Sequence, residues 1–218
     1  MGSQTEENYL KALYKLSDDK GNVGVSDLSS MLKVSVPTAN SMVKKMHSRG
    51  WLKYEKYKPI TITPKGKKMA SMIIRKHRLT EMYLVEQMGF SWENVHEIAE
   101  QVEHVKSEAF FDRMDELLGF PKFDPHGSPI PDKNGKIVEQ NLIKLSDCSE
   151  GQHYTLSALL DSKKDLLEYL NNRSLFLGTK LEIVAKESFD GNMTVRYDSH
   201  ENEVLSQKVC ESLLVNRV

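Results

Sequence analysis

The sequence predicts a mainly α-helical protein with a small β domain at its C-terminal end. Apolar residues recur at the three-to-four-residue spacing of amphipathic helices through most of residues 5–118. Residues 119–140 hold four of the seven prolines, which favours an extended, semi-rigid linker. Beyond residue 140 the apolar period changes to two, as in short strands. We therefore expect four parts, with bounds at residues 1–72, 73–118, 119–140 and 141–218.

The first part has the element order of a winged helix-turn-helix. Helical spacing predicts a first helix over residues 5–16, a short second helix, and a third helix that Pro37 opens and that stops near Gly50. Residues 51–63 then alternate and are rich in β-branched and aromatic side chains, which predicts a β-hairpin. Pro64-Lys65-Gly66 is expected to mark the end of this module.

Charge and surface chemistry make the first part a candidate DNA-binding module. Residues 1–72 contain 13 Lys and Arg against 6 Asp and Glu, whereas residues 73–218 contain 17 against 25. Short polar side chains at the start of the third helix suit base edges, and the lysines suit phosphates. The alternative is a solvated, charged surface without a partner. The candidate DNA contacts are Ser35, Pro37, Thr38, Asn40, Ser41, Lys44 and Lys45 in the helix, and Lys53, Lys56 and Lys58 in the hairpin.

A stripe of metal-ligand side chains follows in the second part. Its members are His77, Glu81, His96, Glu100, Glu103 and His104. Their spacing places the first two on one face of a helix and the others on one face of the next. Imidazoles and carboxylates from two facing helices suit a divalent cation, whereas a solvated face with chance neighbours would seldom hold so many. Beside a DNA-binding module, the stripe indicates a metal-sensing transcription factor.

Other functional classes lack their motifs. The string His96-Glu97-Ile98-Ala99-Glu100 resembles the zincin motif, but a glutamate stands where that motif needs its second histidine. The residue three before His104 is Gln101, so the Glu-x-x-His motif of a di-iron carboxylate bundle fails there, and no activated Ser or Cys arrangement is apparent. We therefore expect neither an enzyme nor a small-molecule substrate. The start of the chain has no signal-peptide pattern, and no run of about 18 apolar residues occurs. We expect a cytoplasmic protein without membrane contact.

A non-specific nucleoprotein with the same fold stays as an alternative. A footprint on one palindromic operator, as opposed to uniform coating of any duplex, would distinguish a regulator from such a protein.

The last part is expected to form a small β-barrel with one inserted helix. Period-two stretches predict strands over residues 142–145, 154–159, 181–184, 193–197 and 204–209, and helical spacing predicts a helix over residues 163–170. Asp190-Gly191 marks a hairpin turn. Cys148 and Cys210 are too few and too distant in sequence for a disulfide framework, and we expect both to be packing residues.

Five strings together resemble the diphtheria toxin repressor / manganese transport regulator family of metal-dependent repressors. They are residues Thr5–Leu10, Ser35–Thr38, Arg75–Leu79, Val102–His104 and Asp124–Pro131. The resemblance covers nearly the whole chain, and the last part is similar to the SH3-like, FeoA-type domain of the longer members. It implies a homodimer assembled through residues 73–118 that binds a palindromic operator of metal-uptake genes, because a winged-helix monomer reads only one half-site.

The resemblance also implies two adjoining metal sites per subunit. His77, Glu81 and His96 match the ancillary site of iron-type members, while Asn8, Glu100, Glu103 and His104 match the primary site. Manganese-type members have a glutamate where this chain has Glu100, whereas iron-type members have a cysteine, so Mn(II) is expected and Fe(II) is the alternative.

Four positions depart from the family pattern. Manganese-type members have an aspartate at the position of Asn8 and a glutamate at that of Lys11. Some iron-type members also donate ancillary ligands from the C-terminal domain, at positions that hold Lys163 and Leu166 here. Asp161 or Asp165 could substitute for these ligands.

Overall fold

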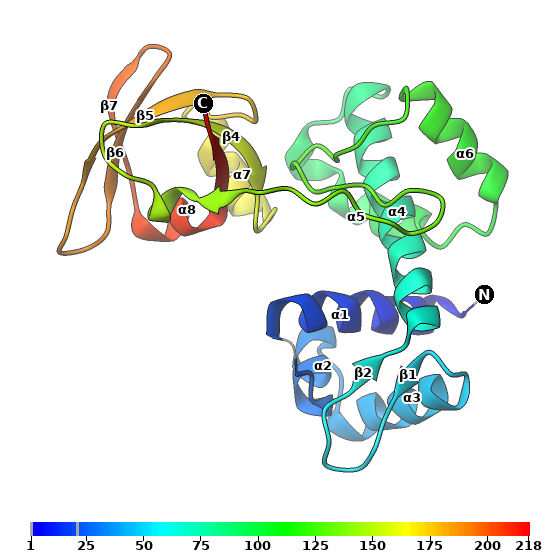
Figure 1. Ribbon diagram of the computed structural model, residues 1–218. Coiled ribbons are helices and arrows are strands. Elements are labelled where there is room, and N and C mark those ends of the chain that lie inside the picture. Colours follow the sequence, from blue (N-terminus) through cyan, green and yellow to red (C-terminus); the bar gives the residue numbers. More distant parts are fainter. Residues whose placement is uncertain (1, 21) are drawn as a thin grey trace. The chain divides into compact units, whose positions relative to one another are not determined.

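The computed structural model describes residues 2–20 and 22–218, which form two compact units (Figure 1). The first unit comprises Met1–Thr80, Ala99–Met114 and Ile130–Ile137, and the second comprises Glu81–Ile98, Asp115–Pro129 and Val138–Val218. Each unit has its own buried apolar core. Of the described helices, none has the length and apolar character that a bilayer crossing requires.

The N-terminal part is a winged helix-turn-helix, as the order of its elements predicts. Its elements are α1 (Gln4–Lys20), α2 (Val25–Leu32), α3 (Val36–Ser48), β1 (Leu52–Lys53) and β2 (Thr61–Ile62). The Ser35 hydroxyl accepts the backbone N–H of Thr38 at 3.2 Å and so caps α3, whose first turn contains Pro37. The two strands pair antiparallel, with Leu52 opposite Ile62. Leu10, Leu28 and Met46 bury the facing sides of the three helices in one core.

The segment that was expected to end this module instead begins the longest helix, α4 (Pro64–Glu86). Proline suits a first helical turn, because the N–H that it lacks has no partner there. Gly66 is required for close packing, since a Cβ atom at this position would lie 1.9 Å from the Trp51 carbonyl oxygen. Three short helices follow, η1 (Trp92–Asn94), α5 (His96–Val102) and α6 (Glu108–Leu117).

Residues 119–140 contain two tight turns, although the prolines predict an extended linker. One Asp124 carboxylate oxygen accepts the backbone N–H groups of His126 and Ser128, each at 2.9 Å. One Asp132 oxygen accepts two further backbone N–H groups at 2.8 Å in the same way. Aspartate side chains favour such turns because they hydrogen-bond to backbone groups a few residues ahead. His126 and Gly127 are buried and belong to the second unit, whereas Ile130–Ile137, which contains the second turn, belongs to the first.

The C-terminal part is a six-stranded antiparallel sheet with two helices. Its elements are β3 (Ile143–Lys144), η2 (Leu145–Asp147), β4 (His153–Leu159), α7 (Lys164–Asn171), β5 (Lys180–Lys186), β6 (Met193–Tyr197), β7 (His200–Leu205), α8 (Gln207–Ser212) and β8 (Leu213–Arg217). The strand order is β3-β8-β4-β5-β6-β7.

The expected strand over residues 204–209 is wrong from Ser206 onward. β7 ends at Leu205, and Ser206 caps α8 by accepting the backbone N–H of Val209. β8 was not predicted, although Leu213 and Val215 alternate with a less buried residue as a strand requires. Cys148 and Cys210 are packing residues in this core, as expected, and burial raises the pKa of the Cys210 thiol to about 11.

We expect the core position Leu28 to control the stability of the winged helix. Leu28→Ala should lower the free energy of unfolding by about 2–5 kcal/mol, because the fully buried side chain leaves a cavity when it is truncated. Met31→Ala on the same helix is the control, since the Met31 side chain is exposed. Urea unfolding measures both, and equal losses would contradict the packing described here.

Candidate metal centre and nucleic-acid interface

The carboxylate of Glu103 is the centre of the first ligand group. Glu103 directly follows α5 and is fully buried. One of its oxygens accepts the His77 Nδ1–H at 2.6 Å, and the Lys11 ammonium donates to its two oxygens at 2.8 and 2.9 Å. The same ammonium donates to Glu100 Oε1 at 2.5 Å. Residues from α1, α4 and α5 therefore meet at one buried carboxylate.

The sequence anticipated Glu100, Glu103 and His77 as ligands, and the structure brings them together. The ligand atoms of these three residues lie within 4.8 Å of one another. His77 was assigned to the ancillary site by resemblance, yet its imidazole contacts Glu103 of the primary group. Because an ionised carboxylate can only accept a hydrogen bond, the proton of this contact is on His77 Nδ1.

His104 is oriented by a carboxylate that the sequence did not assign. The Glu7 carboxylate on α1 accepts the His104 Nδ1–H at 2.7 Å, and His104 Nε2 lies 3.7 Å from Glu103 Oε1. This hydrogen bond fixes the tautomer, so the lone pair of Nε2 points toward the ligand group. Glu7 stands in the Thr5–Leu10 string, but nothing in local spacing links it to a residue 97 positions away.

Asn8 supplies the observation that tests whether a cation fits this group. Its side-chain oxygen Oδ1 is buried and has no hydrogen-bond partner. A buried polar atom is normally satisfied, and an amide oxygen without a donor suits a hard divalent cation. Asn8 lies one turn before Lys11 on α1 and next to Glu7 in sequence. The primary group thus fits a metal ion through carboxylate, amide and imidazole atoms.

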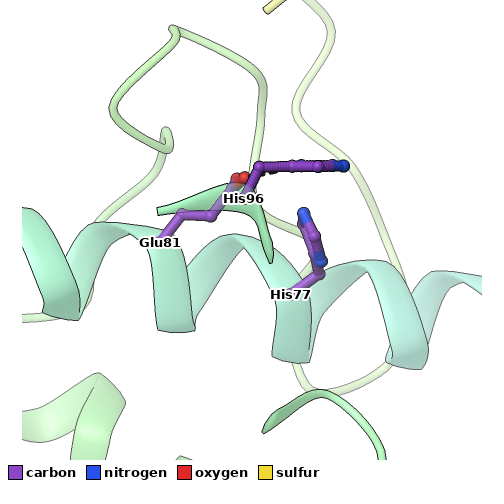
Figure 2. A group of neighbouring side chains, drawn as sticks. All are labelled: His77, Glu81 and His96. Carbon is purple, nitrogen blue, oxygen red and sulfur yellow. Dashed lines mark hydrogen bonds and ion pairs between the residues drawn. The ribbon is translucent and has the colours of Figure 1, made fainter. Parts of the chain in front are cut away.

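The predicted ancillary residues His77, Glu81 and His96 are neighbouring side chains (Figure 2). His77 and Glu81 are one turn apart on α4, and His96 begins α5. The Glu81 carboxylate is buried, and its Oε1 lies 3.2 Å from His96 Nδ1. His96 is more than half exposed, so it offers a route from solvent to Glu81.

A third group joins Glu81 to Asp124 and His126, which the sequence did not assign as ligands. The ligand atoms of these three buried residues lie within 4.8 Å of one another. His126 Nε2 donates to the Trp92 carbonyl at 3.0 Å, and the His126 and Trp92 rings stack at 5.8 Å. Nε2 is therefore protonated, and Nδ1 keeps its lone pair, 3.9 Å from Glu81 Oε2.

The turn around Asp124 and His126 is held by a close backbone approach. Gly127 has a φ of +83°, and a Cβ atom there would lie 2.3 Å from the Ser157 carbonyl oxygen. Asp124-Pro125-His126-Gly127 lies in the string most specific to the resemblance, and its Asp-x-His spacing is the signal that could have identified these ligands. Asp161 and Asp165 are outside the three ligand groups found among the described residues, and Asp161 forms an ion pair with Lys163.

The predicted DNA-contacting side chains are exposed, except that Asn40 is half-buried. The Asn40 side-chain oxygen accepts the Tyr54 hydroxyl at 2.7 Å, which ties α3 to the hairpin. In the hairpin, Lys53 is exposed, Lys56 lies over the Tyr57 ring and Lys58 forms an ion pair with Glu55.

Glu6 links α1 to the end of the candidate recognition helix, a contact that sequence reasoning missed. Its buried carboxylate pairs with Lys45 and with Arg49, each at 3.1 Å. Burial opposes the charged form, but the Ser3 backbone N–H, Lys45 and Arg49 outweigh it, so the pKa of Glu6 lies below its ordinary value. Arg49 thereby adds a second cation at the end of α3.

Family models match three stretches that together span most of the chain. An iron dependent repressor N-terminal DNA binding domain matches residues 1–60, an iron dependent repressor metal binding and dimerisation domain matches residues 63–132, and an FeoA domain matches residues 143–217. The HTH-type transcriptional regulator MntR of Lysinibacillus sphaericus is 32% identical over 155 residues, which are 70% of this chain and 99% of that relative. The chain belongs to the diphtheria toxin repressor / manganese transport regulator family. It is a metal-dependent transcriptional repressor.

Other relatives cover nearly the full length. The iron-dependent repressor IdeR of Mycobacterium leprae is 27% identical over 226 residues, covering 98% of this chain and 97% of that protein. A manganese-dependent transcriptional repressor in complex with manganese has a TM-score of 0.87 at 29% identity, covering 98% of this chain and 100% of that one. ScaR with bound Cd²⁺ has a TM-score of 0.82 at 31% identity, covering 98% and 99%. The predicted fold class, with a DNA-binding domain, a helical dimerisation domain and an FeoA domain, is confirmed.

We expect Glu7 to raise metal affinity without touching the metal. Glu7→Gln should weaken Mn²⁺ binding about 10–100-fold, because the His104 ring loses the carboxylate that orients it. Isothermal titration measures the affinity, with the exposed Glu139→Gln as the control. Unchanged affinity in Glu7→Gln would show that His104 needs no such partner.

Proposed function

We propose that this repressor is activated by Mn(II), binds a palindromic operator as a homodimer and controls metal-uptake genes. The observation that carries the choice of metal is the donor set of the primary group. It consists of carboxylate, amide and imidazole atoms, with Glu100 at the position that distinguishes the family's two types. Both cysteines are buried in the C-terminal core, so neither can supply a thiolate ligand in place of Glu100. Oxygen-rich sites suit Mn(II), while thiolates suit softer metals.

Fe(II) is the second candidate. The full-length Mycobacterium leprae relative is an iron-dependent repressor by name, and imidazole suits iron as well as manganese. First-row affinities place Mn(II) below Fe(II), so selectivity must come from geometry and metal availability.

The proposed ligands form one primary and one ancillary site per subunit. The primary site comprises Asn8, Glu100, Glu103 and His104, beside which His77 contacts Glu103. The ancillary site centres on Glu81, whose two oxygens face His96 and His126 respectively. A bound cation would place positive charge between ligands from α1 and ligands at α5. It could shift the conformational equilibrium toward the DNA-competent arrangement only if it binds that arrangement more tightly than the alternative.

The proposed DNA contacts are surface residues at the start of α3, along α3 and in the hairpin, all exposed except the half-buried Asn40. Ser35, Pro37, Thr38, Asn40 and Ser41 would face base edges, while Lys44, Lys45, Lys53, Lys56 and Lys58 would face phosphates. A homodimer would present two such surfaces to a two-fold symmetric operator. Support for dimerisation comes from the matched dimerisation domain and from α6, which leaves Phe110 and Leu117 exposed on one face, two turns apart.

The metal requirement is tested at Glu103. Wild type should bind an operator duplex tightly in Mn²⁺ and weakly in chelator, and Glu103→Gln should remove this difference, because a neutral amide replaces the central carboxylate. Fluorescence anisotropy measures the binding, and circular dichroism checks that the variant folds. Equal operator affinity of the wild type in chelator and in Mn²⁺ would overturn the proposal.

The choice of metal is tested at Glu100. Operator binding is titrated anaerobically with buffered Mn²⁺ and Fe²⁺, in wild type and in Glu100→Cys. We expect Mn²⁺ to activate the wild type at its buffered cellular level, and we expect the thiolate variant to shift activation toward Fe²⁺. Equal activation of the wild type by Fe²⁺, with no shift in the variant, would contradict the assignment of Mn(II).

A further inference from the structure

Lys11 places a positive charge at the oxygens that a metal ion would need. Its ammonium has three N–H donors, and three carboxylate oxygens lie within 2.9 Å, one from Glu100 and two from Glu103. The Glu103 side chain is fully buried, and the Lys11 side chain is 22% exposed. The contact crosses 92 residues of sequence and joins α1 to the end of α5. These three side chains thus form a partly buried charge cluster in which the Lys11 ammonium faces three carboxylate oxygens.

An ammonium and a divalent cation compete for the same lone pairs. A carboxylate oxygen that accepts a hydrogen bond from Lys11 already uses one lone pair, and its negative charge is already balanced by the ammonium. A metal ion must therefore displace Lys11 from that oxygen or share the oxygen with it. Lys11 can leave, because its ammonium sits on a flexible four-carbon stem with part of its length at the surface. Glu103 cannot, because it is packed in the interior.

The charge balance limits how many ions this group can hold. Lys11 contacts two carboxylates, which one divalent ion neutralises. Even with the Glu7 carboxylate beside His104 counted, two divalent ions would bring four positive charges to three carboxylates, in addition to the charge of Lys11 itself. Asn8 adds an oxygen but no charge. The group therefore favours one divalent ion over two.

We propose that Lys11 is a tethered cation that holds Glu100 and Glu103 in the metal-free protein, leaves them when a metal binds, and restricts the primary site to one ion. This inference rests on the proposed metal function and concerns the regulation of the same site. It makes metal binding an exchange of one cation for another, so the apparent affinity is lower than the ligands alone would give. It also means that α1 is tied to α5 before metal arrives.

The exchange is tested with Lys11→Met, which keeps the stem and removes the charge. Lys15→Met, one turn later on α1 and exposed, is the matched control. Both are made in the full chain with Glu81→Gln, so that the ancillary ligands do not contribute to Mn²⁺ titrations. Lys11→Met should bind Mn²⁺ at least about tenfold more tightly than the control and should melt at a lower temperature in chelator. Lys11→Glu should bind one Mn²⁺ more per subunit than the control.

A second measurement uses the wild-type chain, so the inference stays testable if a variant fails to fold. Reductive methylation of lysines, quantified by mass spectrometry, should label Lys11 several-fold faster in Mn²⁺ than in chelator, with Lys15 as the internal reference. The inference would be overturned if labelling of Lys11 did not rise with Mn²⁺, or if Lys11→Met and the control bound Mn²⁺ with identical affinity. In either case the proposed function would stand, because Mn²⁺ would still bind. Failure of all chains to bind Mn²⁺ at the primary group would overturn both.

Discussion

The buried carboxylate of Glu103 is the constraint around which the metal-binding region is organised. An isolated charge in a protein interior is costly, and removing one partner of a buried pair is more damaging than replacing the whole pair. Glu103 is satisfied by His77 from α4 and Lys11 from α1. Three elements that are distant in sequence therefore have to approach one another for the fold to be stable. The same approach brings Glu100 and His104 close to Glu103.

Helix α1 connects this region to the DNA-facing surface through consecutive side chains. Glu6 pairs with Lys45 and Arg49 at the end of α3, while the next residue, Glu7, orients His104. The physical path from the ligand group to the recognition helix therefore passes through two adjacent residues of α1. Coupling between two sites needs an element that both sites bias, and α1 has contacts to each.

Much of the fold could be predicted from the sequence, because helical and strand periods are local properties. The helices, the hairpin and the ligand stripe follow from spacing within about 30 residues. The contacts of Lys11 and Glu7 could not, since they join residues 89 to 97 positions apart. The Asp124 and His126 ligand group was hidden for a different reason: its residues occupy a proline-rich stretch whose composition resembles a linker. The prediction that Pro64 ends the first module was wrong because proline is common both in loops that follow a domain and in the first turn of a helix.

The contacts of α1 set a limit on how this segment can vary. Residues 7, 8 and 11 lie within about 100° of one another around the helix axis, whereas residue 6 points about 100° away from residue 7, toward α3. Substitutions on the exposed side of α1 leave these directions unchanged. A single inserted or deleted residue between positions 8 and 11 would rotate one set of contacts by about 100° relative to the other. The length of this helix segment is thus under stricter constraint than its composition.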